Sequence, residues 1–174
     1  NLSNPNSFAI HFNSIDDTNK RSVLSPDVGS NKLGQAYAKQ LGFGFAVIDK
    51  RRSAHNESEV AYLVGDISSR HVLIIDDMID TAGTISNAAK VAKEKGALSV
   101  TIAATHGVLS GNAIDRLSSD AIDQIFISDT VAIPNEKKIE KLTMISSAKI
   151  FAETINRIHT GESVSQLFEE EKHE

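Results

Sequence analysis

The stretch VLIIDDMIDTAGT, residues 72–84, contains both a structural and a chemical signal. Its first four residues are apolar and do not alternate with polar ones, which is typical of a strand buried on both faces of a sheet. Two adjacent acids, Asp76 and Asp77, end that run, and Asp80 follows before a small, hydroxyl-rich turn. Beyond the turn a helical pattern continues to Gly96. A strand, a turn and a helix in this order predict an α/β fold.

The rest of the chain alternates short apolar segments with helical patterns of about three turns. We predict strands at residues 22–25, 43–49, 72–76, 100–105, 124–128 and 141–146, and helices at residues 31–42, 84–96, 113–117 and 147–161. The polar, charged segment at residues 50–59 is expected to be a loop. This alternation predicts a mostly parallel sheet with helices on both faces.

Three of the predicted helices have an apolar face that we expect to pack inward. The faces comprise Leu33, Ala36, Tyr37 and Leu41 in the first helix, Ile85, Ala88, Ala89 and Ala92 in the second, and Ala148, Phe151, Ala152, Ile155 and Ile158 in the last. Glycines at positions 42, 96 and 161 follow these helices, and glycine is a common stop signal.

The chain has 174 residues, which predicts one compact unit. Residues 1–20 are rich in asparagine and include only a short apolar patch, Phe8 to Phe12, which is a candidate strand. We expect residues 1–20 to be the remnant of a missing first domain and residues 21–174 to form the α/β domain. The chain opens with Asn1 rather than Met, so we expect a fragment, a processed product or a trimmed chain.

Composition argues against several classes of partner. The net charge of −5 lacks the basic excess of a generic nucleic-acid surface. No apolar run approaches the roughly 20 residues that span a bilayer, and no signal-peptide pattern is present. The absence of cysteine fits a reducing compartment. We therefore expect a cytoplasmic protein with neither a nucleic-acid nor a membrane partner.

The acids of the opening stretch indicate a ligand. In open α/β sheets, ligands bind at the carboxyl ends of strands, where Asp76 and Asp77 are predicted to lie. Two acids emerging from a buried strand are costly unless a cation or hydroxyl donors meet them. The small-residue turn at 80–84 leads into a helix, whose N-terminal amides favour a phosphate. A sugar phosphate matches both features, although Asp80 or Thr81 could instead simply cap the helix.

This combination of acids and turn resembles the ribose-5-phosphate motif of the ribose-phosphate pyrophosphokinases, which make phosphoribosyl pyrophosphate. Its shorter core also resembles the phosphoribosyltransferases at large. Further stretches resemble the pyrophosphokinases specifically: SPDVG at 25–29, DKRRSAHNESEV at 49–60, THGVLSG at 105–111 and RIHTGESVSQLF at 157–168. The resemblance extends from Arg21 to Phe168 and implies a type I phosphoribosyltransferase-like fold.

The resemblance also implies roles for individual residues. Asp76 and Asp77 would bind the ribose hydroxyls, and the 5-phosphate would be held by Asp80, Thr81, Ala82, Gly83 and Thr84. Asp27 resembles the family's metal-binding aspartate, with Mg²⁺ as the cofactor. The pyrophosphate-contacting loop corresponds to Gly29, Ser30, Asn31 and Lys32. Catalytic basic residues correspond to Lys50 and Arg52, and residues near a regulatory nucleotide site correspond to Ser163, Ser165 and Phe168.

The substrates implied by the resemblance are ribose 5-phosphate and ATP, and the implied assembly is a homo-oligomer, a hexamer. Purely structural roles stay open as alternatives: an exposed loop for residues 50–52, tail packing for residues 163–168, and a core or turn role for His106. His159 is expected in the last turn of a helix, where its positive charge is favourable. Ser30 and Leu33 depart from the family pattern, which usually has a glycine and an arginine there.

Three functions fit these features. The leading one is the C-terminal half of a ribose-phosphate pyrophosphokinase, whose first domain would supply adenine contacts and a metal-binding histidine. The second is a salvage phosphoribosyltransferase, although no segment resembles a base-binding hood. The third is a non-catalytic regulatory subunit of a pyrophosphokinase assembly, a hypothesis prompted by the shortened chain and the two departures.

Overall fold

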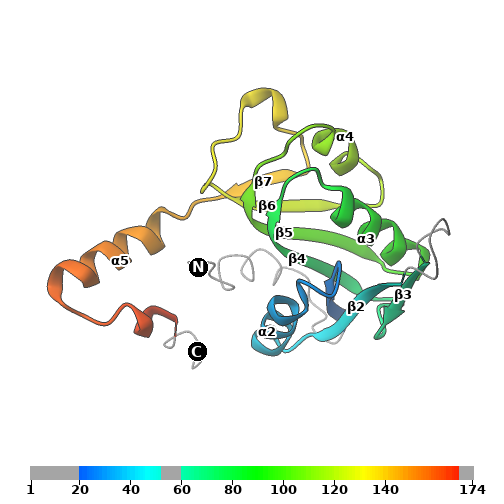
Figure 1. The fold of residues 1–174 in the computed structure, drawn as a ribbon, viewed down its shortest axis with the longest axis horizontal. Helices are drawn as coiled ribbons and strands as arrows, with labels where there is room; N and C mark the ends of the chain where they lie inside the picture. Colours follow the sequence, from blue (N-terminus) through cyan, green and yellow to red (C-terminus); the bar gives the residue numbers. More distant parts are fainter. Residues whose placement is uncertain (1–19, 52–59, 169–174) are drawn as a thin grey trace.

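The computed structural model describes residues 20–51 and 60–168 (Figure 1). Within these residues a seven-stranded sheet has the order β3-β2-β1-β4-β5-β6-β7. Its strands are β1 (Arg21–Ser25), β2 (Gly44–Arg51), β3 (Val60–Val64), β4 (His71–Ile79), β5 (Ser99–Gly107), β6 (Gln124–Ser128) and β7 (Leu142–Ile145). Every neighbouring pair is parallel except β2 and β3. The predicted, mostly parallel α/β sheet is confirmed.

Helices cover both faces of this sheet. Helix α2 (Asn31–Leu41) packs on one face, over a cluster that includes Tyr37 and Leu73. Helices α3 (Gly83–Glu94) and α4 (Ala113–Leu117) lie on the other, over the larger cluster. The predicted inward face of α3 is confirmed, because all four of its residues are buried. In α2 the prediction was wrong at Ala36, which is exposed, while Ala38 is buried in its place.

The strand order creates a switch point between β1 and β4. Helix α2 connects β1 to β2 on one side of the pair, and α3 connects β4 to β5 on the other, so the two connections lie on opposite faces of the sheet. At such a point the loops after the two strands diverge and leave a crevice beyond their carboxyl ends. The loop after β1 and the end of β4 are therefore side by side, although about 50 residues separate them.

The central strand β4 is longer than predicted. Its first buried residues, Val72 to Ile75, are covered on both faces as expected. The prediction that the strand ends at Asp76 was wrong, since the ladder with β5 continues through Met78, opposite His106, and Ile79, opposite Gly107. The acids consequently lie within the pleat of a strand, where successive side chains point to opposite faces.

The predicted loop at residues 50–59 is partly strand. Strand β2 reaches Arg51, and β3 pairs with it antiparallel, with Lys50 opposite Ala61. Strand β3 was not predicted from the sequence because its alternation is short: Tyr62 and Val64 are exposed and only Leu63 between them is partly buried. Such an edge strand lacks the continuous apolar run that marked β4. Residues 52–59, like 1–19 and 169–174, lie outside the described residues, so the expected domain boundary near residue 20 stays a prediction.

The last helix, α5 (Ala148–Thr160), departs most from expectation. Its predicted inward face was wrong, because none of its residues is buried, and Ile155 and Ile158 are each 66% exposed. Figure 1 shows α5 extending away from the sheet beyond β7. Asp129, after β6, holds its start by accepting hydrogen bonds from the Ser147 N–H (2.7 Å) and the Ser146 hydroxyl (2.9 Å). The helical period predicted an apolar face but carries no information on what covers it.

Two 3₁₀ turns complete the described elements: η2 (Asn135–Lys137) and η3 (Ser165–Phe168). Among the described residues, no helix has both the length and the apolar character needed to cross a bilayer.

Matched substitutions in α3 and α5 test this difference in packing. Ile85 is 2% exposed, so Ile85→Ala should lower the free energy of unfolding by about 2 to 5 kcal/mol through lost burial and a cavity. Ile155→Ala should change it by no more than about 0.5 kcal/mol, because its side chain is in water. Urea titration followed by circular dichroism measures both. A loss above about 1.5 kcal/mol for Ile155→Ala would show that α5 packs its apolar face in solution.

Candidate functional site

The crevice between β1 and β4 contains a cavity of about 410 Å³. Acids from both sides line it: Asp27, in the loop after β1, and Asp76 and Asp77, on β4. The remaining lining comes from the same loop and from the start of α2, namely Gly29, Ser30 and Leu33. The structure thus brings together the predicted metal ligand, two of the predicted pyrophosphate residues and the predicted ribose acids.

Hydrogen bonds within its loop hold the Asp27 carboxylate. The Ser30 N–H and hydroxyl donate to Asp27 Oδ1 at 3.0 and 3.1 Å. The hydroxyl of Ser25, at the end of β1, in turn donates to the Ser30 carbonyl at 3.3 Å. A Cβ on Gly29 would approach Asp27 Oδ1 to 3.2 Å, so glycine leaves room for the carboxylate. Ser30, one of the two departures from the family pattern, therefore orients the predicted metal ligand.

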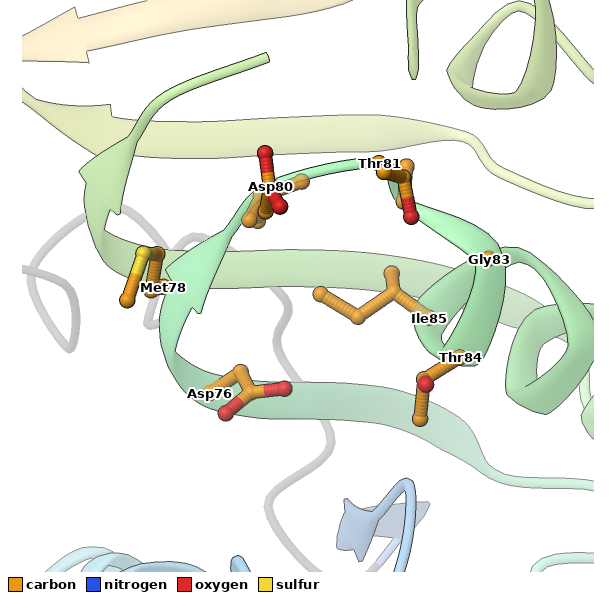
Figure 2. Close-up of a pocket in the computed structure, with 9 residues that line it drawn as sticks. Asp76, Met78, Asp80, Thr81, Gly83, Thr84 and Ile85 are labelled. Atoms are coloured by element: carbon orange, nitrogen blue, oxygen red, sulfur yellow. The ribbon is translucent and has the colours of Figure 1, made fainter. Parts of the chain in front are cut away.

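A second cavity, of about 150 Å³, lies between β4 and α3 (Figure 2). Asp76 lies at one edge of it, the turn from Asp80 to Thr84 borders it, and Met78, Ile79 and Ile85 complete the lining. Asp76 therefore belongs to both cavities, whereas Asp77 lines only the larger one. The predicted acids and the predicted phosphate turn share this site through Asp76.

The turn presents backbone N–H groups. The first backbone hydrogen bond of α3 runs from the Ser86 N–H to the Ala82 carbonyl at 3.0 Å. The amides of Gly83, Thr84 and Ile85 precede that bond, and N–H groups at these positions have no intrahelical acceptor. Ala82 has a φ of 58°, a left-handed conformation that costs an alanine about 1 kcal/mol or more. Unpaired amides around a left-handed residue form a concave site that suits an anion.

The capping alternative for Asp80 and Thr81 was wrong. The N-cap of α3 is Ala82, and within the described part of the chain no side chain forms a capping hydrogen bond with α3. The Asp80 carboxylate instead accepts a hydrogen bond from the Ser110 hydroxyl, in the loop after β5. The side chain of Thr81 lines the smaller cavity, so its hydroxyl is available to a ligand there.

Two residues that contact the turn were missed as site residues. Ser110 lies within the THGVLSG stretch, so that motif was the signal that could have identified it. Arg116, on α4, donates from Nη1 to the Thr81 carbonyl at 2.7 Å. No feature of the sequence around Arg116 indicated this contact, because it depends on how α4 packs beside α3.

The environment of Asp76 opposes its ionisation. Burial raises the pKa of Asp76 to about 6 from an ordinary value of 3.8, and the neighbouring charges of Asp77 and Asp27 add to the rise. The Asp77 N–H, which donates to Asp76 Oδ1 at 2.9 Å, offsets part of it. Three carboxylates around one cavity leave a need for a cation or for hydroxyl donors.

The residues present fit Mg²⁺ as a partner of phosphate. Within the described residues, no group of three His, Cys, Asp or Glu side chains is spaced to hold a metal ion by itself. Mg²⁺ usually takes one or two carboxylates and completes its shell with water and substrate phosphate oxygens. Asp27 suits that role, because Ser30 occupies Oδ1 while Oδ2 has no hydrogen-bond partner among the described residues.

Other predicted residues lie elsewhere. Asn31 and Lys32 start α2 but do not line the larger cavity. The backbone of Lys50 lies at the end of β2, its side chain is not described, and Arg52 lies outside the described residues. Their predicted roles stay predictions.

The predicted regulatory residues follow α5, away from both cavities. The Ser163 carbonyl accepts a hydrogen bond from Arg157 Nη1 at 3.2 Å, which ties this segment to α5. Ser165 and the backbone of Phe168 belong to η3, and the side chain of Phe168 is not described. This arrangement fits tail packing, and the regulatory role stays a prediction.

The two histidines singled out in the sequence also lie outside the cavities. His106 is the penultimate residue of β5, and its Nδ1 lies 2.8 Å from the Thr130 hydroxyl. His159 is in the last turn of α5, as predicted.

The raised pKa of Asp76 makes a testable stability prediction. Well below pH 3.8 the group is neutral in both folded and unfolded states. As pH rises toward 6, the unfolded chain ionises first, so the folded state loses relative stability, and the penalty persists at pH 7. Asp76→Asn should therefore be more stable than wild type at pH 7 by about 1 kcal/mol, allowing for solvent screening of this partly exposed group.

Urea titrations between pH 4 and pH 7.5 measure the difference between the two proteins. We expect that difference to grow across the window and then level off. Asp115→Asn, on the exposed surface of α4, serves as the control for the loss of one surface carboxylate. An Asp76→Asn protein that is less stable than wild type at pH 7 would contradict the prediction.

Comparison with known proteins supports the resemblance noted in the sequence. Residues 52–169 match the family described as phosphoribosyl synthetase-associated domain. The ribose-phosphate pyrophosphokinase of Caldanaerobacter subterraneus subsp. tengcongensis is 47% identical over 146 residues, which cover 84% of this chain and 46% of that protein. That of Chlorobaculum tepidum is 43% identical over 161 residues, covering 91% and 49%. The chain thus spans about half the length of these curated relatives.

Solved structures agree on the fold. The phosphoribosylpyrophosphate synthetase of Mycobacterium smegmatis has a TM-score of 0.81 at 33% identity, covering 90% of this chain and 51% of that one. The adenine phosphoribosyl transferase of Trypanosoma brucei has a TM-score of 0.50 at 16% identity, covering 83% and 63%, and this likeness concerns the fold alone. The type I phosphoribosyltransferase-like fold is confirmed. This chain belongs to the phosphoribosyl synthetase-associated domain family, together with relatives named ribose-phosphate pyrophosphokinase.

Proposed function

We propose that this chain binds ribose 5-phosphate as the C-terminal half of a ribose-phosphate pyrophosphokinase. The observation that carries the proposal is the meeting of two chemically different cavities at Asp76. One is bordered by backbone amides and threonine hydroxyls, and the other by carboxylates. A phosphate requires the first environment, and sugar hydroxyls with a cation require the second. Ribose 5-phosphate carries its phosphate and its diol at opposite ends of one small molecule.

Each end of the sugar phosphate would meet complementary groups: hydrogen-bond donors at the phosphate and carboxylate acceptors at the hydroxyls. In the smaller cavity, the N–H groups of Gly83 and Thr84 and the hydroxyl groups of Thr81 and Thr84 supply donors to the 5-phosphate. Asp76, at the shared edge, can accept hydrogen bonds from a ribose hydroxyl, and Asp77 lies in the larger cavity next to it. A hydroxyl donor favours the ionised form of Asp76 and so offsets the cost of its burial.

The anomeric carbon would then lie toward the larger cavity, where the reaction is proposed to occur. The anomeric hydroxyl attacks the β-phosphorus of ATP and loses its proton; an O–P bond forms, and the bond from that phosphorus to the oxygen of the α-phosphate breaks, releasing AMP. Bound Mg²⁺ would neutralise charge on the transferred diphosphoryl group. Asp27 would hold that ion through Oδ2, with its orientation set by Ser30.

Lys50 and Arg52 are proposed to supply further positive charge at the transferred group. Arginine suits bidentate contact with phosphate oxygens, whereas lysine acts as a compact point charge. The adenine contacts and the metal-binding histidine are proposed to come from the half of the relatives that this chain does not span. The hexameric assembly and the cytoplasmic location stay predictions.

Calorimetry of this chain with ribose 5-phosphate and Mg²⁺ tests the binding proposal, and Gly83→Ala provides its sharpest variant. A Cβ at Gly83 would meet only Arg116 Nη1 at 3.5 Å and the Thr81 hydroxyl at 3.8 Å, both ordinary contacts, so the fold tolerates alanine. Because Gly83 lines the smaller cavity, we expect the added methyl group nevertheless to hinder the approach of a phosphate to its backbone. We expect Gly83→Ala to unfold as wild type does and to bind ribose 5-phosphate about tenfold more weakly.

Ribose without the phosphate serves as the ligand control, since it lacks the group that the smaller cavity is proposed to hold. Absence of heat from wild-type chain with ribose 5-phosphate would remove the proposal.

A second test addresses catalysis. AMP should form from ATP and ribose 5-phosphate only when the missing half is supplied in the full-length protein. There, Lys50→Ala or Arg52→Ala should lower kcat by more than about tenfold, because charge neutralisation in the transition state is lost. Unchanged turnover in both variants would favour the non-catalytic alternative.

A further inference from the structure

We infer that Arg116 is a positioning residue for the phosphate turn: it holds the Thr81 carbonyl and thereby aims the Ala82 N–H into the smaller cavity. This inference rests on the proposed binding of a sugar phosphate. The contact joins residues that are 35 positions apart, from α4 to the turn before α3, with Nη1 and the carbonyl oxygen 2.7 Å apart.

Peptide geometry converts this contact into an orientation. In a planar trans peptide, the carbonyl of one residue and the N–H of the next point in opposite directions. The described residues contain no cis peptide. A guanidinium that holds the Thr81 carbonyl on the α4 side therefore directs the Ala82 N–H away from α4. Ala82 lines the smaller cavity, and its N–H has no acceptor among the described residues.

Arg116 completes a series of such contacts. The two preceding carbonyls, of Ile79 and Asp80, accept hydrogen bonds from backbone N–H groups of the loop after β5. The distances are 2.9 Å from Val108 and 3.1 Å from Leu109 to Ile79, and 3.0 Å from Ser110 to Asp80. Three successive carbonyls are thus held from one side, and Arg116 is the only side chain that takes part in the series within the described residues.

The left-handed backbone of Ala82 explains why the hydrogen bond from Arg116 to the Thr81 carbonyl matters. A non-glycine residue at a φ of 58° is strained, and such strain persists only where the surroundings determine it. The hydrogen bond from Arg116 is formed at the peptide immediately before Ala82. Without it, the Thr81–Ala82 peptide could rotate to relieve the strain, and its N–H would leave the cavity. The binding site would then have to be ordered again by each ligand, which weakens affinity.

Helix α4 is itself hydrogen-bonded to helix α3. The Ser86 hydroxyl of α3 donates to the Arg116 carbonyl at 3.4 Å. The segment that follows α4 is held separately by Lys141, whose Nζ donates to the carbonyls of Ser119 (2.9 Å) and Ile122 (2.8 Å). Lys141 is therefore a matched control: a cation that binds carbonyls next to α4 but not at the phosphate turn.

The test compares Arg116→Ala, Arg116→Lys and Lys141→Ala by calorimetry with ribose 5-phosphate and Mg²⁺. Arg116→Ala should weaken binding about tenfold, the loss expected when a charged hydrogen bond no longer supports the site. Arg116→Lys, which retains a charged donor, should bind within about threefold of wild type. Lys141→Ala should lower thermal stability and leave affinity unchanged. Binding by Arg116→Ala within about twofold of wild type would overturn the inference.

Two further readouts separate positioning from general stability. In amide NMR spectra of the unliganded chain, Arg116→Ala should shift the Ala82 N–H signal, and Lys141→Ala should not. In the full-length protein, Arg116→Ala should raise the KM for ribose 5-phosphate with kcat little changed, because the 5-phosphate is held equally before and during the reaction.

If the wild-type chain fails to bind ribose 5-phosphate, the proposed function is wrong. The NMR comparison still tests whether Arg116 positions the Ala82 N–H. An unmoved Ala82 signal in Arg116→Ala would overturn the inference whether or not the wild type binds ligand.

Discussion

The parallel pairing of β1 with β4 is the constraint on which the site depends. The register places Leu24 opposite Ile74, so the loop after β1 begins beside the part of β4 that carries the acids. Their connecting helices then leave on opposite faces, which opens the crevice. Asp27 and Asp76, nearly 50 residues apart in the chain, face one cavity only because of this pairing. A shift in that register would separate the acids while leaving every helix and strand intact.

Two features of the site are energetically unfavourable, and a ligand can offset both. Asp76 is a partly buried acid with two other carboxylates nearby, and its raised pKa of about 6 measures that cost. Ala82 adopts a left-handed backbone that presents amides to a neighbouring cavity. Hydroxyl donors or a cation would relieve the first, and an anion would relieve the second. Costs of this kind at one place are typical of binding sites, where stability and function oppose each other.

Support for the phosphate turn comes from outside the motif that defines it. The carbonyls of residues 79–81 are held by the loop after β5 and by Arg116 of α4. The motif residues therefore provide the chemical groups, and a separate part of the chain sets their direction. The same division applies to Asp27, whose orientation comes from Ser30, a residue that departs from the family pattern. A departure in sequence can thus add a hydrogen bond that the usual glycine cannot make.

The sequence by itself determined the α/β class, the buried character of β4, the inward face of α3 and the chemical identity of the acids and the turn, because each follows from local periodicity or residue type. Tertiary structure alone decided which acids share a cavity, the extension of β4 past Asp77, the edge strand β3 and the contact of Arg116 with Thr81. It also decided that the apolar face of α5 is exposed. A helical period shows that a face is apolar, but only packing between distant segments shows whether anything covers it.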